Sequence, residues 1–487
     1  MSRLSDRQVD EIARRVLATL SGGGAAAAAP VATGATARPP ADLPAWPAGI
    51  HPNIDAAVQA ARAAFVEFGR LTLVKRTEII AAIRRSMLAH AAELADEAAR
   101  ETGLGRAEDK VIKNRLVTSK TPGPEVLVPI TYTGDRGLTL LERAPYGVIG
   151  SITPTTNPTS TIICNTIGML AAGNAVVFNV HPNARRVSIR NVALLNEAIL
   201  SAGGPANLVN AIPEPTIETA TELMRHPGVR LLVVTGGAAV VKAAMTSGKR
   251  AICAGPGNPP VVVDETADLA QAAHDVVRGA SFDNNVICVD EKETFVVERV
   301  ADAFLHEMAR NDAVVLSAAQ LKQLERVVFS EVRGPRKPGV MNKELIGKNA
   351  ATILEKIGLR AAASVRLVVC DVPVDHPLIW TEQMMPVMPV ARVRSADEGI
   401  DLARQAEHGF GHSAAMHSRN IDALSRMARE INTSIFVKNA PIYAGLGEGG
   451  EGYCSFSIAS PTGEGLTDPR SFSRERRCVL VDHFRIV

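Results

Sequence analysis

Cysteine thiols are the side chains of this sequence best suited to act as nucleophiles at neutral pH. None of them belongs to a C-x-x-C pair or to a Cys/His spacing of the zinc-finger type, which predicts free thiols in a reducing compartment. The six cysteines are Cys164, Cys253, Cys288, Cys370, Cys454 and Cys478. Each one alone is more often a small buried hydrophobe than a nucleophile, and Cys164 and Cys370, in apolar runs, keep that interpretation.

Three histidines that lie close together in the sequence raise the question of a metal site. They are His408, His412 and His417. No acidic residue or cysteine follows them at the spacing of a ligand set, so we predict no metal site here.

The segments that must position these groups alternate between helical and strand patterns. Residues 54–68 and 74–101 carry apolar side chains at helical spacing. Short runs rich in β-branched residues follow at 146–153, 175–180, 230–234 and 260–264, with helical stretches between them. This alternation predicts βαβ units and a mostly parallel α/β sheet, with a nucleotide at the carboxyl ends of the strands.

The first of these strands ends in Gly150-Ser-Ile-Thr-Pro-Thr-Thr-Asn157-Pro-Thr rather than in a G-x-G-x-x-G turn. The run P-Y-G-V-I-G-S-I-T-P-x-x-N-P resembles the signature of the aldehyde dehydrogenase superfamily. Further motifs match the family in the same order, and the resemblance covers residues 46–487. They are Ala175–Pro182, Val233–Gly237, Asn284–Cys288 and Glu382–Val387.

The resemblance implies an α/β aldehyde dehydrogenase fold with a Rossmann-like NAD-binding domain, an α/β catalytic domain and a small β oligomerisation flap. It places Cys288 at the nucleophile and Asn157 at the donor to an oxyanion. It also implies contacts with NAD: the adenosine ribose at Asn179, the pyrophosphate at the turn after Thr235, and the nicotinamide ribose at Glu382. The full set of implied NAD-binding residues is Ile152, Thr153, Pro154, Thr155, Asn179, His181, Pro182, Thr235, Gly236, Gly237, Ala254, Gly255 and Glu382.

The residue types agree with that chemistry. A thiolate that adds to an aldehyde creates a tetrahedral adduct whose oxygen needs pre-oriented donors, and the Asn157 amide and the Cys288 backbone N–H are two such donors. Each donor is worth roughly 3 to 4 kcal/mol by analogy with other oxyanion holes. Because it matches the family position and follows two asparagines, Cys288 is the nucleophile that we predict.

A departure from the family occurs in the segment 253–260, Cys-Ala-Gly-Pro-Gly-Asn-Pro-Pro. Hydrolytic aldehyde dehydrogenases carry a glutamate here that activates water, and either alignment of the following proline puts Cys253 or Ala254 at that place. Without this base the thioester should persist in water, whereas a thiol attacks thioesters readily. We therefore expect a thiol as the acyl acceptor. The sequence resembles the CoA-acylating branch of the family, whose motifs are similar to 408–418, 459–465 and 477–482.

The cofactor and substrate predictions depend on this branch. Asn179 is neutral where hydrolytic members usually place a lysine, which favours NAD over NADP. We expect CoA as co-substrate and a short aliphatic aldehyde, with propionaldehyde first. The alternatives are acetaldehyde or a semialdehyde, and, from a different class of protein, an inactive scaffold. An arginine in the substrate pocket would favour a semialdehyde.

The first 45 residues differ in pattern and composition from the rest of the chain. Residues 1–20 carry one apolar stripe, from Val9 to Leu20, at helical spacing after a capping box at Ser5 and Gln8, which predicts a short amphipathic helix. Residues 21–45 are rich in Ala, Gly and Pro and predict a disordered linker. A helix docked on its own domain is the alternative. Microcompartment members of the CoA-acylating branch carry such an extension, which implies binding to shell protein and a place in the lumen of a bacterial microcompartment.

The remaining boundaries and exclusions follow. We assign 46–127 and 143–256 to the NAD-binding domain, 128–142 and 456–487 to the flap of a dimer or tetramer, and 257–455 to the catalytic domain. A net charge of +2 and 4% aromatic residues argue against a nucleic-acid-binding surface. The sequence contains no uninterrupted run of about 18 apolar residues, so we predict no transmembrane helix.

Overall fold

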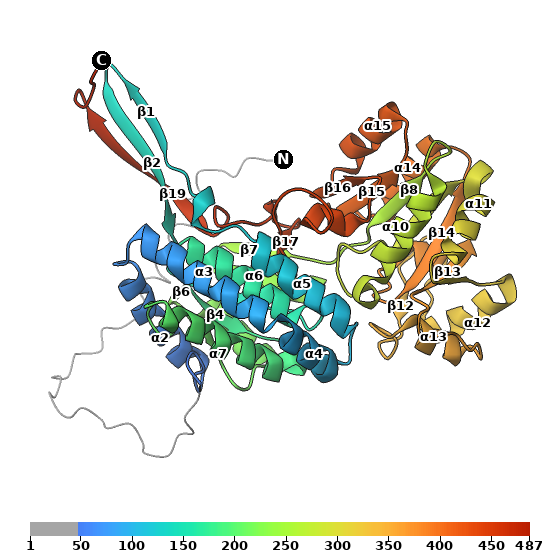
Figure 1. Ribbon diagram of the computed structural model, residues 1–487, viewed down its shortest axis with the longest axis horizontal. Coiled ribbons are helices and arrows are strands. Elements are labelled where there is room, and N and C mark those ends of the chain that lie inside the picture. The colour runs from blue at the N-terminus through green and yellow to red at the C-terminus, as the bar shows by residue number, and fades with distance from the viewer. Residues whose placement is uncertain (1–46) are drawn as a thin grey trace, which may run out of the picture. The chain divides into compact units, whose positions relative to one another are not determined.

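Figure 1 shows a computed structural model of the chain, which describes residues 47–487. The predicted helix at 1–20 and the predicted linker at 21–45 lie outside this range. The described residues belong to one compact unit. Within 47–487, no helix is both long enough and apolar enough to cross a membrane.

Within residues 47–487, four α-helices precede the first parallel sheet. They are α2 (Ile54–Phe68), α3 (Leu73–Ala89), α4 (Ala91–Thr102) and α5 (Ala107–Lys120). The predicted helix at 54–68 is confirmed, and its N-cap is Asn53, whose side chain accepts from the backbone N–H of Ala56. The helical pattern at 74–101 covers two helices rather than one, because His90 takes non-helical angles (φ −96°, ψ 6°) and separates α3 from α4.

The first sheet has five parallel strands in the order β5-β4-β3-β6-β7. Their bounds are β3 (Val148–Ile152), β4 (Ala175–Asn179), β5 (Val209–Ala211), β6 (Val229–Thr235) and β7 (Ala251–Ala254). The connecting helices are α6 (Pro158–Ala171), α7 (Arg185–Ser201), α8 (Ile217–Arg225) and α9 (Ala238–Met245). The strand order reverses between β3 and β6, and in such sheets ligands bind beyond the carboxyl ends of the strands at that point.

The second sheet has seven parallel strands in the order β10-β13-β14-β9-β8-β15-β16. Its strands are β8 (Pro260–Val263), β9 (Glu293–Val297), β10 (Ala313–Val315), β13 (Leu367–Val372), β14 (Val387–Val393), β15 (Ser413–His417) and β16 (Ile435–Lys438). Its helices are α10 (Leu269–Ser281), α11 (Glu298–Ala309), α12 (Ala318–Val328), α13 (Ala350–Lys356), α14 (Ala396–Ala406) and α15 (Ile421–Ile431). The chain passes from the first sheet to the second between residues 254 and 260.

The α/β class with parallel sheets is confirmed, and each strand predicted at 146–153, 175–180, 230–234 and 260–264 is present within two residues at either end. β3, β4 and β8 are buried along their whole length, and β6 is buried except at Arg230 and Thr235, which explains their nearly continuous apolar sequences. The domain boundaries themselves remain predictions.

A third, antiparallel sheet projects away from the two parallel sheets (Figure 1). It consists of β1 (Ile130–Gly134), β2 (Gly137–Pro145) and β19 (Ser473–Val481), and all residues of β1 are exposed. Large apolar side chains on it face solvent, among them Ile130, Tyr132, Val479 and Val481. This arm is the segment that we predicted as a flap, with β2 extending three residues beyond the predicted boundary at 142.

Candidate active site

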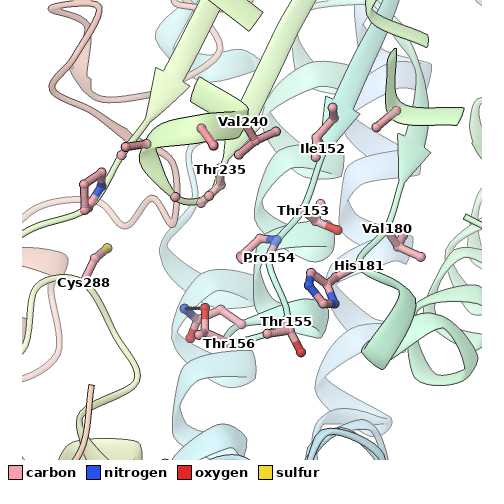
Figure 2. A pocket seen from close by; sticks show the side chains of 18 of the residues that line it. Ile152, Thr153, Pro154, Thr155, Thr156, Val180, His181, Thr235, Val240 and Cys288 are labelled. Carbon is pink, nitrogen blue, oxygen red and sulfur yellow. Dashed lines mark hydrogen bonds between the residues drawn. The ribbon is translucent and has the colours of Figure 1, made fainter. Parts of the chain in front are cut away.

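A cavity of about 950 Å³ opens at the carboxyl ends of β3, β4 and β6, where the strand order reverses. Its wall contains both predicted catalytic residues, Cys288 and Asn157. It also contains every predicted NAD-binding residue except Ala254: Ile152, Thr153, Pro154, Thr155, Asn179, His181, Pro182, Thr235, Gly236, Gly237, Gly255 and Glu382. Figure 2 shows Cys288 on one side of the cavity and Thr153, Thr155 and His181 on the other.

Cys288 lies in a loop whose backbone is fixed by three consecutive left-handed residues. Asp283, Asn284 and Asn285 have φ angles of 47°, 54° and 65°. Asp and Asn adopt this conformation more readily than other residues with a side chain, because their short polar groups bond locally. Asn285 Nδ2 donates to the carbonyl oxygens of Ala280 (2.8 Å) and Glu291 (2.9 Å). We call residues 282–289 the nucleophile loop.

The thiol of Cys288 is partly buried, and its charge state depends on the surrounding groups. Burial raises the pKa of Cys288 to about 12, because the thiolate loses water, and the carboxyl of Glu382 adds to the shift. The ammonium of Lys292 opposes it. Lys292 Nζ donates to the carbonyl oxygen of Ile287 at 3.0 Å, so this buried cation also holds the residue before the nucleophile.

Asn157 stands at the N-cap of α6, and its side chain forms no hydrogen bond to the first turn of that helix. Its Oδ1 accepts instead from Nζ of Lys113 at 2.6 Å. Its Nδ2 lies 3.1 Å from Oγ1 of Thr156 and 3.5 Å from the carbonyl oxygen of Val286, in the nucleophile loop. The amide is therefore held between α5 and the loop that carries Cys288.

Two buried cations of α5, which are absent from the predicted site residues, lie behind Asn157. Lys110 and Lys113 are 2% and 1% exposed, and both pair with the carboxylate of Asp283. A signal was present: α5 reads AEDKVIKNRLVTSK, and its apolar residues do not form a full inward stripe. A helix without such a stripe that is nevertheless buried points to polar partners on its inner face.

The side of the cavity formed by the first sheet has free polar groups. The hydroxyls of Thr153 and Thr155 are buried without a hydrogen-bond partner, which is a costly state unless a ligand supplies one. Gly236 and Gly237 form the turn from β6 into α9, at the start of which backbone N–H groups point outward. Asn179 Oδ1 accepts from the hydroxyl of Thr219 at 2.7 Å. These residues fit a dinucleotide with its phosphates at the turn.

Glu382 is the one carboxyl among the cavity-lining residues of the described chain, and no lysine or arginine is among them. Burial raises its pKa, and the backbone N–H of Gly257 donates to its Oε1 at 3.4 Å. Gly257 also permits a close approach, because a Cβ there would lie 2.9 Å from the carbonyl oxygen of Cys288. Ala254 is buried at the end of β7 and does not reach the cavity, unlike its neighbour Gly255.

The three histidines near residue 412 do not come together as ligands. His412 and His417 are buried, and burial lowers their pKa values to about 3 and about 4, so both are neutral at physiological pH. His408 Nε2 lies 3.0 Å from the carbonyl oxygen of Trp380. Across residues 47–487, no group of three or more His, Cys, Asp and Glu side chains has the arrangement of a metal site.

Comparisons with known proteins agree with the geometry. A sequence model of the aldehyde dehydrogenase family matches residues 41–452. The acetaldehyde dehydrogenase (acetylating) EutE of Salmonella typhimurium is 52% identical over 440 residues, which are 90% of this chain and 94% of that protein.

Two solved structures are also similar. A propionaldehyde dehydrogenase of Rhodopseudomonas palustris, with bound CoA and an acylated cysteine, has a TM-score of 0.86 and 47% identity, covering 89% of this chain and 98% of that one. A propionaldehyde dehydrogenase from the fucose utilisation bacterial microcompartment of Clostridium phytofermentans has a TM-score of 0.87 and 44% identity, covering 90% of this chain and 100% of that one.

Proposed function

The chain belongs to the aldehyde dehydrogenase family, and we propose that it oxidises a short aliphatic aldehyde to an acyl-CoA, with NAD as hydride acceptor. The observation that carries this proposal is the placement of Cys288 and Asn157 on one cavity at the switch point of the first sheet. The proposed nucleophile, the proposed oxyanion donor and the proposed dinucleotide-binding residues therefore line the same cavity. The relatives that share most of this chain are acylating aldehyde dehydrogenases.

Cys288 performs the first step. Its thiol releases a proton to solvent, and the sulfur adds to the aldehyde carbon while the C=O π electrons move to oxygen, forming a thiohemiacetal whose oxygen bears negative charge. Nδ2 of Asn157 and the backbone N–H of Cys288 donate to that oxygen, and both donors are fixed before the reaction, so little reorganisation is needed. Collapse of the adduct expels hydride and leaves a thioester on Cys288.

The residues along the first sheet and Glu382 support the cofactor. When bound, NAD⁺ supplies the acceptor for the hydride. Thr153 and Thr155 offer unpartnered hydroxyls to it, the start of α9 after Gly237 offers backbone N–H groups, and Glu382 is expected to accept from ribose hydroxyls. The absence of lysine and arginine among the described lining residues fits NAD better than NADP, whose 2′-phosphate is usually paired with a cation.

The acyl group leaves Cys288 for a thiol. At neutral pH a useful fraction of an ordinary thiol is already thiolate, and thiolates exchange readily with thioesters. Water needs a carboxylate base, and residues 253–259 contain none. CoA sulfur therefore attacks the Cys288 thioester, the same two donors hold the second oxyanion, and Cys288 is released as a thiolate.

The substrate is expected to be a two- or three-carbon aldehyde. We expect NADH formation with acetaldehyde and propionaldehyde, in the presence of CoA, to exceed that with butyraldehyde. Acetaldehyde and propionaldehyde differ by one methylene, which changes kcat/KM in an apolar pocket by only about 10- to 200-fold. The ratio of kcat/KM for these two aldehydes therefore identifies the preferred chain length. The measurement is kcat/KM for each aldehyde at saturating NAD⁺ and CoA. A strong preference for a carboxylate-bearing semialdehyde would contradict this substrate class.

The projecting arm supports a proposal about assembly. A three-stranded sheet with Ile130, Tyr132, Val479 and Val481 exposed on one protomer is stabilised when another protomer covers it. The protein therefore forms a homo-oligomer, a dimer or tetramer, and analytical ultracentrifugation of the purified protein distinguishes these from a monomer.

Residues 1–20 are proposed to direct the enzyme to a bacterial microcompartment. The support is their amphipathic pattern, the Ala/Gly/Pro-rich sequence after them, and the microcompartment origin of the Clostridium relative. Deleting residues 1–20 is expected to leave kcat and KM unchanged within about twofold, while co-sedimentation with purified microcompartment shells is lost. A fusion of residues 1–45 to a fluorescent protein is the control and should co-sediment. If the truncated enzyme loses activity but still co-sediments, the segment is part of the enzyme.

A further inference from the structure

We propose that Lys113 is a positioning residue, which fixes the Asn157 side-chain amide with its N–H groups toward the oxyanion formed on Cys288. This inference rests on the proposed function, because it concerns the same oxyanion. It assigns a role to a buried cation of α5 that does not line the cavity.

The face of α5 brings three polar side chains to the site. Lys113 and Asn114 follow Lys110 by three and four positions, so both lie on the same side of the helix as Lys110. All three are at most 2% exposed. Asn114 Oδ1 accepts from the hydroxyl of Thr159, in the first turn of α6, at 2.8 Å. α5 therefore contacts the start of α6 at two points, Asn157 and Thr159.

The N-cap of α6 shows that Asn157 is not used for helix stability. Asparagine is among the preferred N-cap residues because its side-chain oxygen accepts from the first turn, a bond worth about 1 kcal/mol. Asn157 occupies that position without making the bond. Its Oδ1 bonds to Lys113 Nζ at 2.6 Å instead. The side chain is thus directed away from its ordinary local partner and toward the site.

The chemistry of the ammonium group decides which way the amide faces. An amide can exchange the positions of its oxygen and nitrogen by rotating half a turn, but a lysine only donates. The atom next to Lys113 Nζ must therefore be Oδ1, and Nδ2 must lie on the other side, where it is 3.5 Å from the carbonyl oxygen of Val286. The positive charge of Lys113 beside Oδ1 also polarises the amide, so that its N–H groups become stronger donors.

Lys113 is charged at neutral pH although it is fully buried. Burial lowers the pKa of Lys113 to about 8, and the carboxylate of Asp283 opposes that shift. The charge of an unpaired buried ammonium is costly, so the pairing with Asp283 is what keeps it in place. Asp283 begins the left-handed run of the nucleophile loop, and Lys113 thereby links the oxyanion donor to the loop of the nucleophile.

Pairing with Asp283 does not by itself account for Lys113. Lys110 Nζ already lies 2.8 Å from Oδ2 of Asp283, and the backbone N–H of Arg106 donates to Oδ1 at 2.7 Å. Both lysines are buried, both are on α5 and both pair with this carboxylate. Lys113 bonds to the Asn157 side chain, whereas Lys110 Nζ donates to the backbone carbonyl oxygen of Thr156 at 3.3 Å, so Lys110 is a control that lacks the side-chain contact.

The test compares Lys113→Met with Lys110→Met in the full-length enzyme. For Lys113→Met we expect kcat for aldehyde oxidation to fall by about 10²-fold, the scale of losing one oxyanion donor, while KM for the aldehyde changes by less than about threefold. Lys110→Met should lower kcat by less than about tenfold. The rate at which iodoacetamide alkylates Cys288, which needs no oxyanion donor, should stay within about threefold of wild type in both variants.

A double-mutant cycle with Asn157→Ala separates positioning from general support. If Lys113 acts through Asn157, Lys113→Met lowers kcat by less than about threefold once Asn157 is alanine. Independent, additive losses would overturn the proposal, as would equal losses for Lys113→Met and Lys110→Met. Should the methionine variants fail to fold, the pair Lys113→Gln and Lys110→Gln gives the same comparison with polar side chains. A wild-type enzyme that forms no NADH would refute the proposed function instead, and the cycle distinguishes the two failures.

Discussion

Replacing Cys288 with alanine is expected to abolish NADH formation from aldehyde, with a loss of at least about 10⁴-fold in kcat, as for other covalent nucleophiles. The physical reason is that no thiohemiacetal forms, so hydride has no adduct to leave. An aldehyde itself is a poor hydride donor because the departing hydride would leave an acyl cation. The measurement is NADH absorbance under saturating aldehyde, NAD⁺ and CoA, together with a melting curve to show that the variant is folded.

Cys253→Ala is the matched control for this experiment. Cys253 is fully buried on β7, and it does not line the cavity. Its loss should cost some stability, about 1 kcal/mol for a small side chain, and leave kcat within a few-fold of wild type. Normal turnover by Cys288→Ala, or a larger loss in Cys253→Ala, would show that Cys288 is not the nucleophile.

Much of the fold was predictable from local pattern. The strands at 175–180 and 260–264 are buried on both faces, so most of their side chains are apolar and many are valines, and such runs stand out in a sequence. The break at His90 was not predicted, because neither neighbour is Gly or Pro and the apolar spacing continues across it. The projecting arm required the family resemblance, since an exposed antiparallel sheet has no strong periodicity of its own.

The candidate site divides in a similar way. Residues that directly follow a strand, such as Thr153 after β3 and Gly236 after β6, were predictable because the carboxyl ends of parallel strands meet at one edge. Ala254 was assigned to the cofactor by alignment alone, and it does not line the cavity, whereas the next residue, Gly255, does. The contact between Asn157 and Lys113 was not predictable, because the two residues belong to different elements and no periodic sequence pattern indicates which side chains of separate elements meet.

The fate of the acyl group is the second large effect. Without CoA, the thioester on Cys288 is expected to persist, because residues 253–259 supply no carboxylate to activate water. Each active site then completes one hydride transfer and stops. Adding CoA releases the acyl group by thiol exchange and restores continuous turnover.

The direct test is the amount of NADH that wild-type enzyme forms from excess propionaldehyde and NAD⁺ when CoA is omitted, followed by mass spectrometry of the peptide that contains Cys288. The account predicts a burst of about one NADH per active site, a propionylated Cys288 that survives the plateau, and resumed NADH formation with loss of the acyl group when CoA is added. Continuous NADH formation without CoA, with propionate released and Cys288 unmodified, would contradict it, because water would then be the acceptor.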